Sequence, residues 1–169
     1  NEFLTAQAEK FGSLAEVAED AIFCIGALPL DKELRTQYLE DAIVYDAFST
    51  YTYIFNTEKE IFKNENVRKA LSMVIDRDAL AAELVYAKAA DGFISPAVWD
   101  SVKKKVSFRS EAESLIVTQA KFDEAQALLD SVDGLDLSKE ITLTVRDIPD
   151  EVMIAEHVEE QWEMLGLKV

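Results

Sequence analysis

The chain is poor in several residue types on which particular functions depend. Its 169 residues include one cysteine, one histidine, three prolines and five glycines. With Cys24 alone, no internal disulfide bond can form, and one cysteine with one histidine cannot supply the usual ligands of a zinc site. No Gly-x-Gly-x-x-Gly or P-loop pattern is present, so nucleotide binding lacks sequence support. We therefore expect neither a metal nor a cofactor.

Long apolar runs and basic clusters are also missing. No run of about 18 apolar residues occurs, so the sequence predicts no transmembrane helix, and no signal-peptide pattern is visible. The formal net charge is −16, from 33 acidic and 17 basic residues. Nucleic-acid binding requires clustered Lys and Arg, whereas the only basic run here is Lys103-Lys104-Lys105, which we interpret as a solvated loop. The charge therefore argues against a nucleic-acid partner.

The sequence contains no convincing catalytic group. His157 lies on a predicted helix among glutamates, which is typical of a surface histidine. The residue counts allow a Ser-His-Asp triad, but no Gly-x-Ser-x-Gly turn is present to position a nucleophile. Acid and base pairs can be written from Glu58 with Glu60 or from Asp76 with Asp78, yet carboxylates are too abundant for any pair to stand out. We expect a protein that is not an enzyme.

What the sequence does contain is the pattern of a globular α/β domain. Hydrophobic residues make up 49% and charged residues 30% of the chain, which excludes a disordered protein. Periodicity of 3.6 predicts helices at residues 2–10, 14–20, 31–41, 65–75, 77–87, 122–132 and 150–165. β-branched, aromatic or alternating segments predict strands at residues 21–26, 42–56 and 141–146, with another beginning at 167–169. The expected fold class is α/β, a mixed sheet of about four to five strands with packed helices.

Two segments are candidates for contact with a ligand. Tyr51, Tyr53 and Phe55 alternate along a predicted strand and give it one aromatic face, which packs against a sheet neighbour or lines a cleft. Residues 88–108 lack a regular pattern, and a connection of that length is often functional or mobile. Trp99 lies within this connection, where an aromatic side chain either covers a ligand or packs locally.

Several motifs, in order, resemble the family 5 extracellular solute-binding proteins, which are the oligopeptide and dipeptide receptors of ABC importers. The resemblance covers about residues 20–100 and 120–169, and residues 98–121 depart from the family's Pro-rich stretch. The motifs that carry it are Leu28-Pro29, Phe55-Asn56-Thr57, Val67-Arg68-Lys69-Ala70-Leu71-Ser72, Ile75-Asp76-Arg77-Asp78-Ala79-Leu80, Phe122-Asp123-Glu124-Ala125-Gln126-Ala127-Leu128-Leu129 and Leu165-Gly166-Leu167-Lys168-Val169.

The resemblance implies a fold, a function and a location. Residues 1–169 would form a single domain, part of the C-terminal lobe of a two-lobed periplasmic-binding-protein-like receptor. Such receptors close their lobes around an oligopeptide or similar small solute without covalent chemistry and deliver it to the permease of an ABC importer. The protein would be extracellular or periplasmic, with a lipid anchor, where one exists, in a segment not present here.

The resemblance also bears on individual residues. We expect ligand contacts from Asn56, Phe93, Ser95 and Trp99. Arg68, Asp76 and Arg77 are interpreted as structural residues that cap helices and form ion pairs. The family's Trp and Asp that hold a peptide's amino terminus would lie beyond residue 169.

Two other functions and one further property remain open at this stage. The chain could be an intracellular solute-sensing domain of a regulator, which an upstream DNA-binding segment would indicate. Less in keeping with the sequence is a carboxylate-based enzyme domain, which requires two acids close together with a perturbed pKa. A lobe without its neighbours exposes apolar surface, so we also expect self-association.

Overall fold

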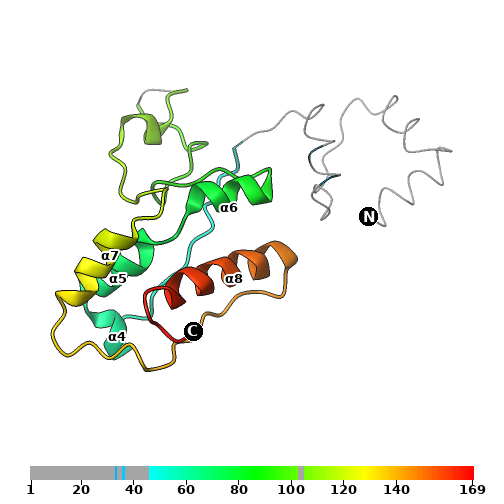
Figure 1. The fold of residues 1–169 in the computed structure, drawn as a ribbon. Coiled ribbons are helices and arrows are strands. Elements are labelled where there is room, and N and C mark those ends of the chain that lie inside the picture. The colour runs from blue at the N-terminus through cyan, green and yellow to red at the C-terminus, as the bar shows by residue number, and fades with distance from the viewer. Residues whose placement is uncertain (1–32, 34–35, 37–45, 103–104) are drawn as a thin grey trace. The chain divides into compact units, whose positions relative to one another are not determined.

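The computed structural model describes residues 33, 36, 46–102 and 105–169 (Figure 1). The chain divides into two compact units, Asn1–Ala42 and Ile43–Val169, and the second contains every element described below. The helices predicted at 2–10 and 14–20, the strand at 21–26 and Cys24 lie outside the described residues. Of the helix predicted at 31–41, Glu33 and Thr36 are described and are helical.

The predicted helices of the second unit are confirmed. They are α5 (Glu65–Met73), α6 (Arg77–Leu84), α7 (Phe122–Asp130) and α8 (Pro149–Glu163). Two short elements were not predicted: α4 (Glu60–Lys63) and the 3₁₀ helix η1 (Phe108–Glu111). Residues 88–102 and 105–107 form no helix and are irregular, as predicted for the segment 88–108, although its last residue begins η1.

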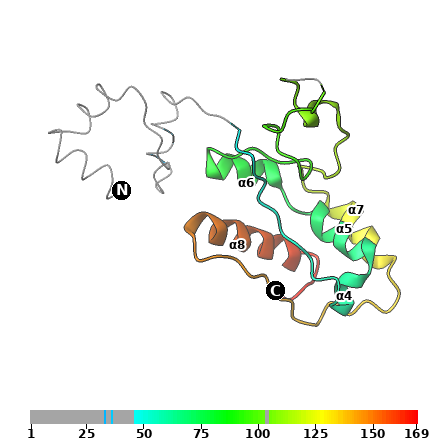
Figure 2. The same ribbon diagram turned by 180° about the vertical axis from the view of Figure 1, so that it is seen from behind.

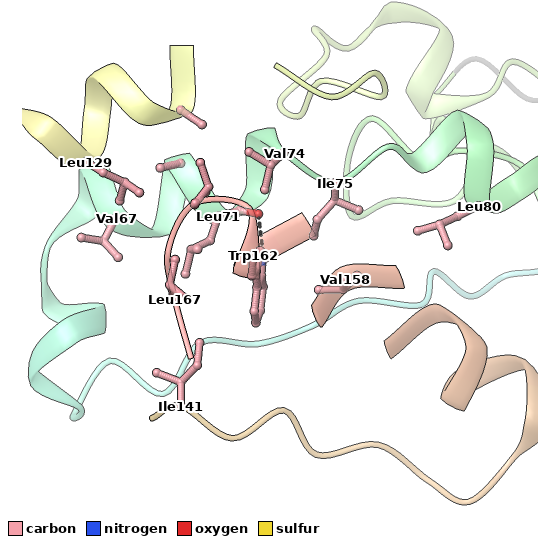
Figure 3. Packing of buried hydrophobic residues seen from close by; sticks show 13 residues of the cluster. Val67, Leu71, Val74, Ile75, Leu80, Leu129, Ile141, Val158, Trp162 and Leu167 are labelled. Atoms are coloured by element: carbon pink, nitrogen blue, oxygen red, sulfur yellow. Dashed lines mark hydrogen bonds between the residues drawn. The ribbon is translucent and has the colours of Figure 1, made fainter. Parts of the chain in front are cut away.

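The core lies where the apolar stripes of these helices meet. Helix α5 packs along α7, and α6 contacts α8; both ribbon views show α5 and α7 side by side (Figures 1 and 2). Apolar residues on one side of α5 and of α8 are buried, with Val67, Leu71 and Val158 fully inaccessible to solvent (Figure 3). Burying a side chain of this kind stabilises the fold by about 1.5–3 kcal/mol. The other buried members of this cluster are Ala70, Val74, Ile75, Leu80, Ala125, Leu129, Ile141, Trp162, Leu165 and Leu167.

The predicted mixed sheet is wrong for the part of the chain that the structure describes. No strand or sheet occurs there, and β pairing is limited to two isolated bridges, Trp99 with Ser107 (antiparallel) and Glu140 with Lys168 (parallel). Residues 46–56 and 139–146 form extended segments without regular secondary structure (Figure 1). Both segments have the alternating pattern of strands, but a sheet also requires a neighbouring strand about 4.8 Å away to accept and donate hydrogen bonds. Among the described residues, no such neighbour runs along either segment.

The residues interpreted as structural lie at helix ends. Arg68 Nη1 donates to the carbonyl oxygens of Phe62 and Lys63 at 2.7 and 2.9 Å, at the end of α4. Asp76 caps α6, because its Oδ1 accepts from the backbone N–H of Ala79 at 2.9 Å. Both groups satisfy backbone atoms that a helix leaves without an internal partner. The capping role is therefore confirmed.

Arg77 joins the end of α5 to a distant part of the chain. Its Nη1 donates to the carbonyl oxygens of Ser72, Ile75 and Val117 at 2.8, 3.1 and 3.1 Å. Its Nη2 donates to Ser72 Oγ at 3.0 Å. Burial lowers the pKa of the guanidinium. Its hydrogen bonds to the described residues end on carbonyl and hydroxyl oxygens, so Arg77 links chain segments through neutral acceptors.

Candidate functional site

An open groove lies between the two extended segments, residues 46–56 and 139–146. Its volume is about 1280 Å³, and residues 51–56 and 139–146 contribute many of its lining residues. Phe55, Phe62 and Trp162 also line it and form an aromatic cluster. The ring centroid of Phe55 lies 5.2 Å from that of Phe62 and 6.1 Å from that of Trp162. The groove therefore combines apolar aromatic lining with two stretches of exposed backbone.

The main chain on both sides of the groove has few hydrogen-bond partners among the residues that the structure describes. Within the part of the chain that the structure describes, the N–H and C=O groups of residues 51–55 and 142–145 form no hydrogen bond. The backbone N–H of Ile141, in contrast, donates to the carbonyl oxygen of Lys168 at 2.8 Å. Unpaired backbone of this kind is a template for an additional strand.

A polar cluster lines the groove near the start of α8. Glu151 is only 8% exposed, and its Oε2 accepts from Arg146 Nε at 3.1 Å. Arg146 Nη2 forms a second, close contact with Glu151 Oε1. The hydrogen bond from Arg146 holds the pKa of Glu151 below its ordinary value, and the Arg146 charge adds to this effect. Burial, together with the neighbouring Tyr51, raises the pKa of the Tyr53 hydroxyl. The cluster is thus a carboxylate and guanidinium pair beside two phenol rings.

A second candidate surface is formed by residues 88–102 and 105–118, a loop that contains the largely buried side chain of Arg109. The Arg109 side chain is 9% exposed, and its Nη2 donates to Asp91 Oδ1 at 2.7 Å. Both terminal nitrogens of Arg109 also donate to the carbonyl oxygen of Glu113 at 3.3 Å. Ser114 Oγ donates to Asp91 Oδ2 at 2.5 Å, and the hydrogen bonds from Ser114 and Arg109 lower the pKa of Asp91. These contacts tie both ends of the loop together.

Glycine at position 92 makes room for this arginine. A Cβ at position 92 would lie 2.9 Å from Arg109 Cζ and from Nη1. Real Cβ atoms essentially never approach other atoms so closely. Any larger residue at position 92 therefore requires the Arg109 guanidinium to shift from this position.

The structure does not bring the four predicted ligand-contact residues together. Asn56 lines the groove, and its Oδ1 accepts from the backbone N–H of Glu58 at 3.0 Å. Phe93 and Trp99 lie in the loop, where they are 64% and 59% exposed. Ser95 is buried in the same loop; its hydroxyl donates to the carbonyl oxygen of Ala47 and accepts from the backbone N–H of Ala97. Ligand contact by these residues stays a prediction.

Sequence reasoning missed the residues that shape both surfaces. Arg109 and Asp91 are 18 positions apart, and nothing in the local pattern pairs them. Arg146 and Glu151 carried a weak signal, because a charge at the end of an alternating segment precedes an acid in the first turn of a helix. Such a spacing favours a charge-assisted contact, but it occurs often in a chain with 33 acidic residues.

The described residues give no sign of a metal centre or of a membrane-crossing helix. No group of three or more His, Cys, Asp or Glu side chains among them could hold a metal ion. His157 is exposed on α8, as predicted, and its Nδ1 lies 3.1 Å from the carbonyl oxygen of Met153. None of the helices in these parts of the chain is both long enough and apolar enough to cross a membrane.

Comparison with known proteins identifies the family. Residues 20–169 match the family described as bacterial extracellular solute-binding proteins, family 5 Middle. The dipeptide-binding protein DppE of Bacillus subtilis (strain 168) is 29% identical over 136 residues, which cover 76% of this chain and 24% of that protein. The chain thus spans about a quarter of the length of that relative. No solved structure matches it. The chain belongs to the bacterial extracellular solute-binding proteins of family 5.

Proposed function

We propose that the chain is part of a solute-binding protein that captures peptides or similar small solutes for an ABC importer. The observation that carries this proposal is the family match over residues 20–169. The name of the Bacillus subtilis relative, a dipeptide-binding protein, supports a peptide as the solute. Such a protein would act outside the cell or in the periplasm and would hand its ligand to a membrane permease, with or without a lipid anchor.

In this proposal the chain contributes side chains to a ligand surface and performs no covalent chemistry. Phe93 and Trp99 are the best placed, because both are largely exposed on a loop that the Arg109 contact with Asp91 restrains. A fixed loop loses little conformational freedom when a ligand binds, which favours affinity. Asn56 is a further candidate in the groove. The buried Ser95 would act by positioning the loop rather than by reaching the ligand.

Native mass spectrometry of the protein purified from its own host, with any flanking sequence that it carries, tests the function. A series of co-purifying peptides of different mass is the expected result. A single non-peptide solute would retain the receptor class and overturn the peptide assignment. A protein that emerges without any solute, and that binds none from a dipeptide and oligopeptide mixture, would contradict the proposal.

Substitution of the exposed aromatics tests the ligand surface. Phe93→Ala and Trp99→Ala should each weaken peptide binding about tenfold or more in calorimetric titration, because exposed aromatic anchors dominate many interfaces. Met164→Ala is the matched control, since Met164 is also apolar and is 69% exposed but lies at the end of α8. Equal affinities of all three variants and the parent protein would place the ligand elsewhere.

A further inference from the structure

Phe93 and Ile94 form an exposed apolar tip between two buried residues of the loop. Gly92, immediately before the tip, and Ser95, immediately after it, are both buried. Ordering a side chain or a loop on binding costs affinity, so an aromatic contact is most effective when its arrangement is fixed beforehand. The contacts on either side of the tip therefore determine how firmly Phe93 is held.

Ser95 holds the C-terminal side of the tip through main-chain groups. Its hydroxyl donates to the carbonyl oxygen of Ala47 and accepts from the backbone N–H of Ala97. Its carbonyl oxygen accepts from the backbone N–H of Val98 at 3.0 Å, which closes a turn. A small buried hydroxyl therefore fixes this end of the tip.

Asp91 holds the N-terminal side of the tip through both its side chain and its main chain. Its carboxylate accepts from Arg109 Nη2 at 2.7 Å and from Ser114 Oγ at 2.5 Å. Its carbonyl oxygen accepts from the backbone N–H groups of Leu115 and Ile116 at 2.8 and 3.2 Å. Asp91 thereby joins two parts of the loop at the start of the tip.

Arg109 makes its contact with Asp91 from a largely buried position. The guanidinium lies against Gly92, and its terminal nitrogens also donate to the carbonyl oxygen of Glu113 at 3.3 Å. Because charged groups lose hydration when they are buried, such a pair often adds no more stability than apolar side chains of similar volume. The pair does, however, fix the direction of the Asp91 side chain and of the main chain next to it.

We propose that Arg109 is a positioning residue that, through Asp91, holds Phe93 in the arrangement that meets the ligand. The inference rests on the proposed function, because it takes Phe93 as a ligand contact. Arg109 itself is largely buried and acts on the ligand only through its neighbours. Trp99 is held differently, by its antiparallel bridge with Ser107. The effect of Arg109 should therefore be specific to Phe93.

Fluorine NMR of the 169-residue chain with para-fluorophenylalanine at position 93 tests the positioning role without any ligand. We expect one narrow resonance from the parent chain. Arg109→Met keeps an unbranched side chain beside Gly92 but cannot bind Asp91, so it should broaden or split the resonance. Asp91→Asn, which removes the charge and keeps the shape of the side chain, should do the same.

A matched control separates this effect from the loss of a positive charge. Lys121→Met removes a cation from an exposed pair with Glu124 and should leave the resonance unchanged. An unchanged resonance in both Arg109→Met and Asp91→Asn would overturn the proposal. Equal broadening in Lys121→Met would also overturn it, because the effect would then be one of net charge.

Calorimetric titration with the tripeptide Ala-Phe-Ala, whose phenyl ring suits an apolar tip, tests the consequence for binding. Arg109→Met should weaken binding roughly fivefold, because Phe93 must then be ordered by the ligand. The same substitution should have no further effect in a Phe93→Ala background and its full effect in a Trp99→Ala background. Equal losses in both backgrounds, or no loss in the parent background, would refute positioning through Phe93.

The two experiments distinguish a failure of this inference from a failure of the proposed function. A parent protein that binds neither Ala-Phe-Ala nor any peptide of a dipeptide and oligopeptide mixture contradicts the proposed function. The fluorine spectra then still decide whether Arg109 holds Phe93, because they require no ligand. A parent protein that binds peptide and is unaffected by Arg109→Met contradicts the positioning role alone.

Discussion

Replacement of Trp162 by phenylalanine tests how the core is assembled. Trp162 is 3% exposed on α8, and its indole Nε1 donates to the carbonyl oxygen of Leu71 at 2.9 Å (Figure 3). Leu71 lies near the end of α5, where carbonyl groups lose their helical partners. The indole N–H therefore completes a helix end from 91 positions away. This contact joins α5 to α8 more specifically than apolar packing alone.

The expected cost of Trp162→Phe follows from that geometry. Phenylalanine retains an aromatic ring beside Phe55 but has no N–H, so the buried Leu71 carbonyl oxygen loses its donor. An unsatisfied buried acceptor costs about 1–3 kcal/mol. A loss of about 2 kcal/mol in the free energy of unfolding should lower the melting temperature of a chain of this size by about 4–8 °C. Trp162→Ala should cost more, about 3–5 kcal/mol, since it also leaves a cavity.

Urea unfolding followed by far-ultraviolet circular dichroism measures this difference. The matched control is Trp99→Phe, because Trp99 is 59% exposed and its replacement should change the free energy of unfolding by no more than about 0.5 kcal/mol. Equal free energies of unfolding for the two variants would refute the assignment of Trp162 to a buried, hydrogen-bonded site.

Three further predictions follow from individual contacts. Arg77→Lys should lower the free energy of unfolding by about 1–3 kcal/mol in urea titration, because an ammonium group cannot reproduce a planar fork that reaches several oxygens. Gly92→Ala should displace the Arg109 guanidinium and speed proteolysis within residues 88–118, with little change in the stability of the helices. Because the pKa of Glu151 is held below its ordinary value of 4.5, its stabilising contribution is complete above that pH and is lost as the pH falls through the folded-state pKa. Glu151→Gln should therefore flatten the loss of stability in acid, as thermal melts across that range would show.

Exposed positions provide the controls for these variants. Lys69→Ala removes an exposed pair with Glu65 and should cost less than about 0.5 kcal/mol; a cost equal to that of Arg77→Lys would contradict the role given to Arg77. Glu156→Gln, on the exposed side of α8, should leave the acid profile unchanged. If Glu156→Gln flattens the profile as much as Glu151→Gln does, the effect is one of net charge and not of the Arg146 contact.

The helices could be predicted from the sequence because their signal is local. Val67 and Leu71 in α5 and Val74, which caps its C-terminal end, recur at helical spacing, and all three are fully buried. The same spacing places Val158 and Trp162 inward on α8. An apolar stripe requires only a surface to cover, and neighbouring helices supply that surface here.

The prediction of a sheet failed for the described residues because strand pairing does not depend on local sequence alone. Residues 141–145 alternate between buried and exposed as a strand does, yet alternation specifies only which side chains face the core. Hydrogen bonds to a neighbour make a strand, and the position of that neighbour is not encoded within the five residues themselves. The same limit applies to Arg109 and Asp91, whose contact joins parts of a loop that no local pattern pairs.

Two of the motifs that resemble the family, at residues 67–72 and 75–80, contain residues that stabilise helix ends. Arg68 and Arg77 donate to carbonyl oxygens at helix ends, and Asp76 caps α6. These contacts depend on the geometry of the helix ends. The exposed aromatics Phe93 and Trp99 belong to a different segment. Substitutions of Arg68, Asp76 and Arg77 should therefore change stability, whereas those of Phe93 and Trp99 should change solute binding in the function proposed above.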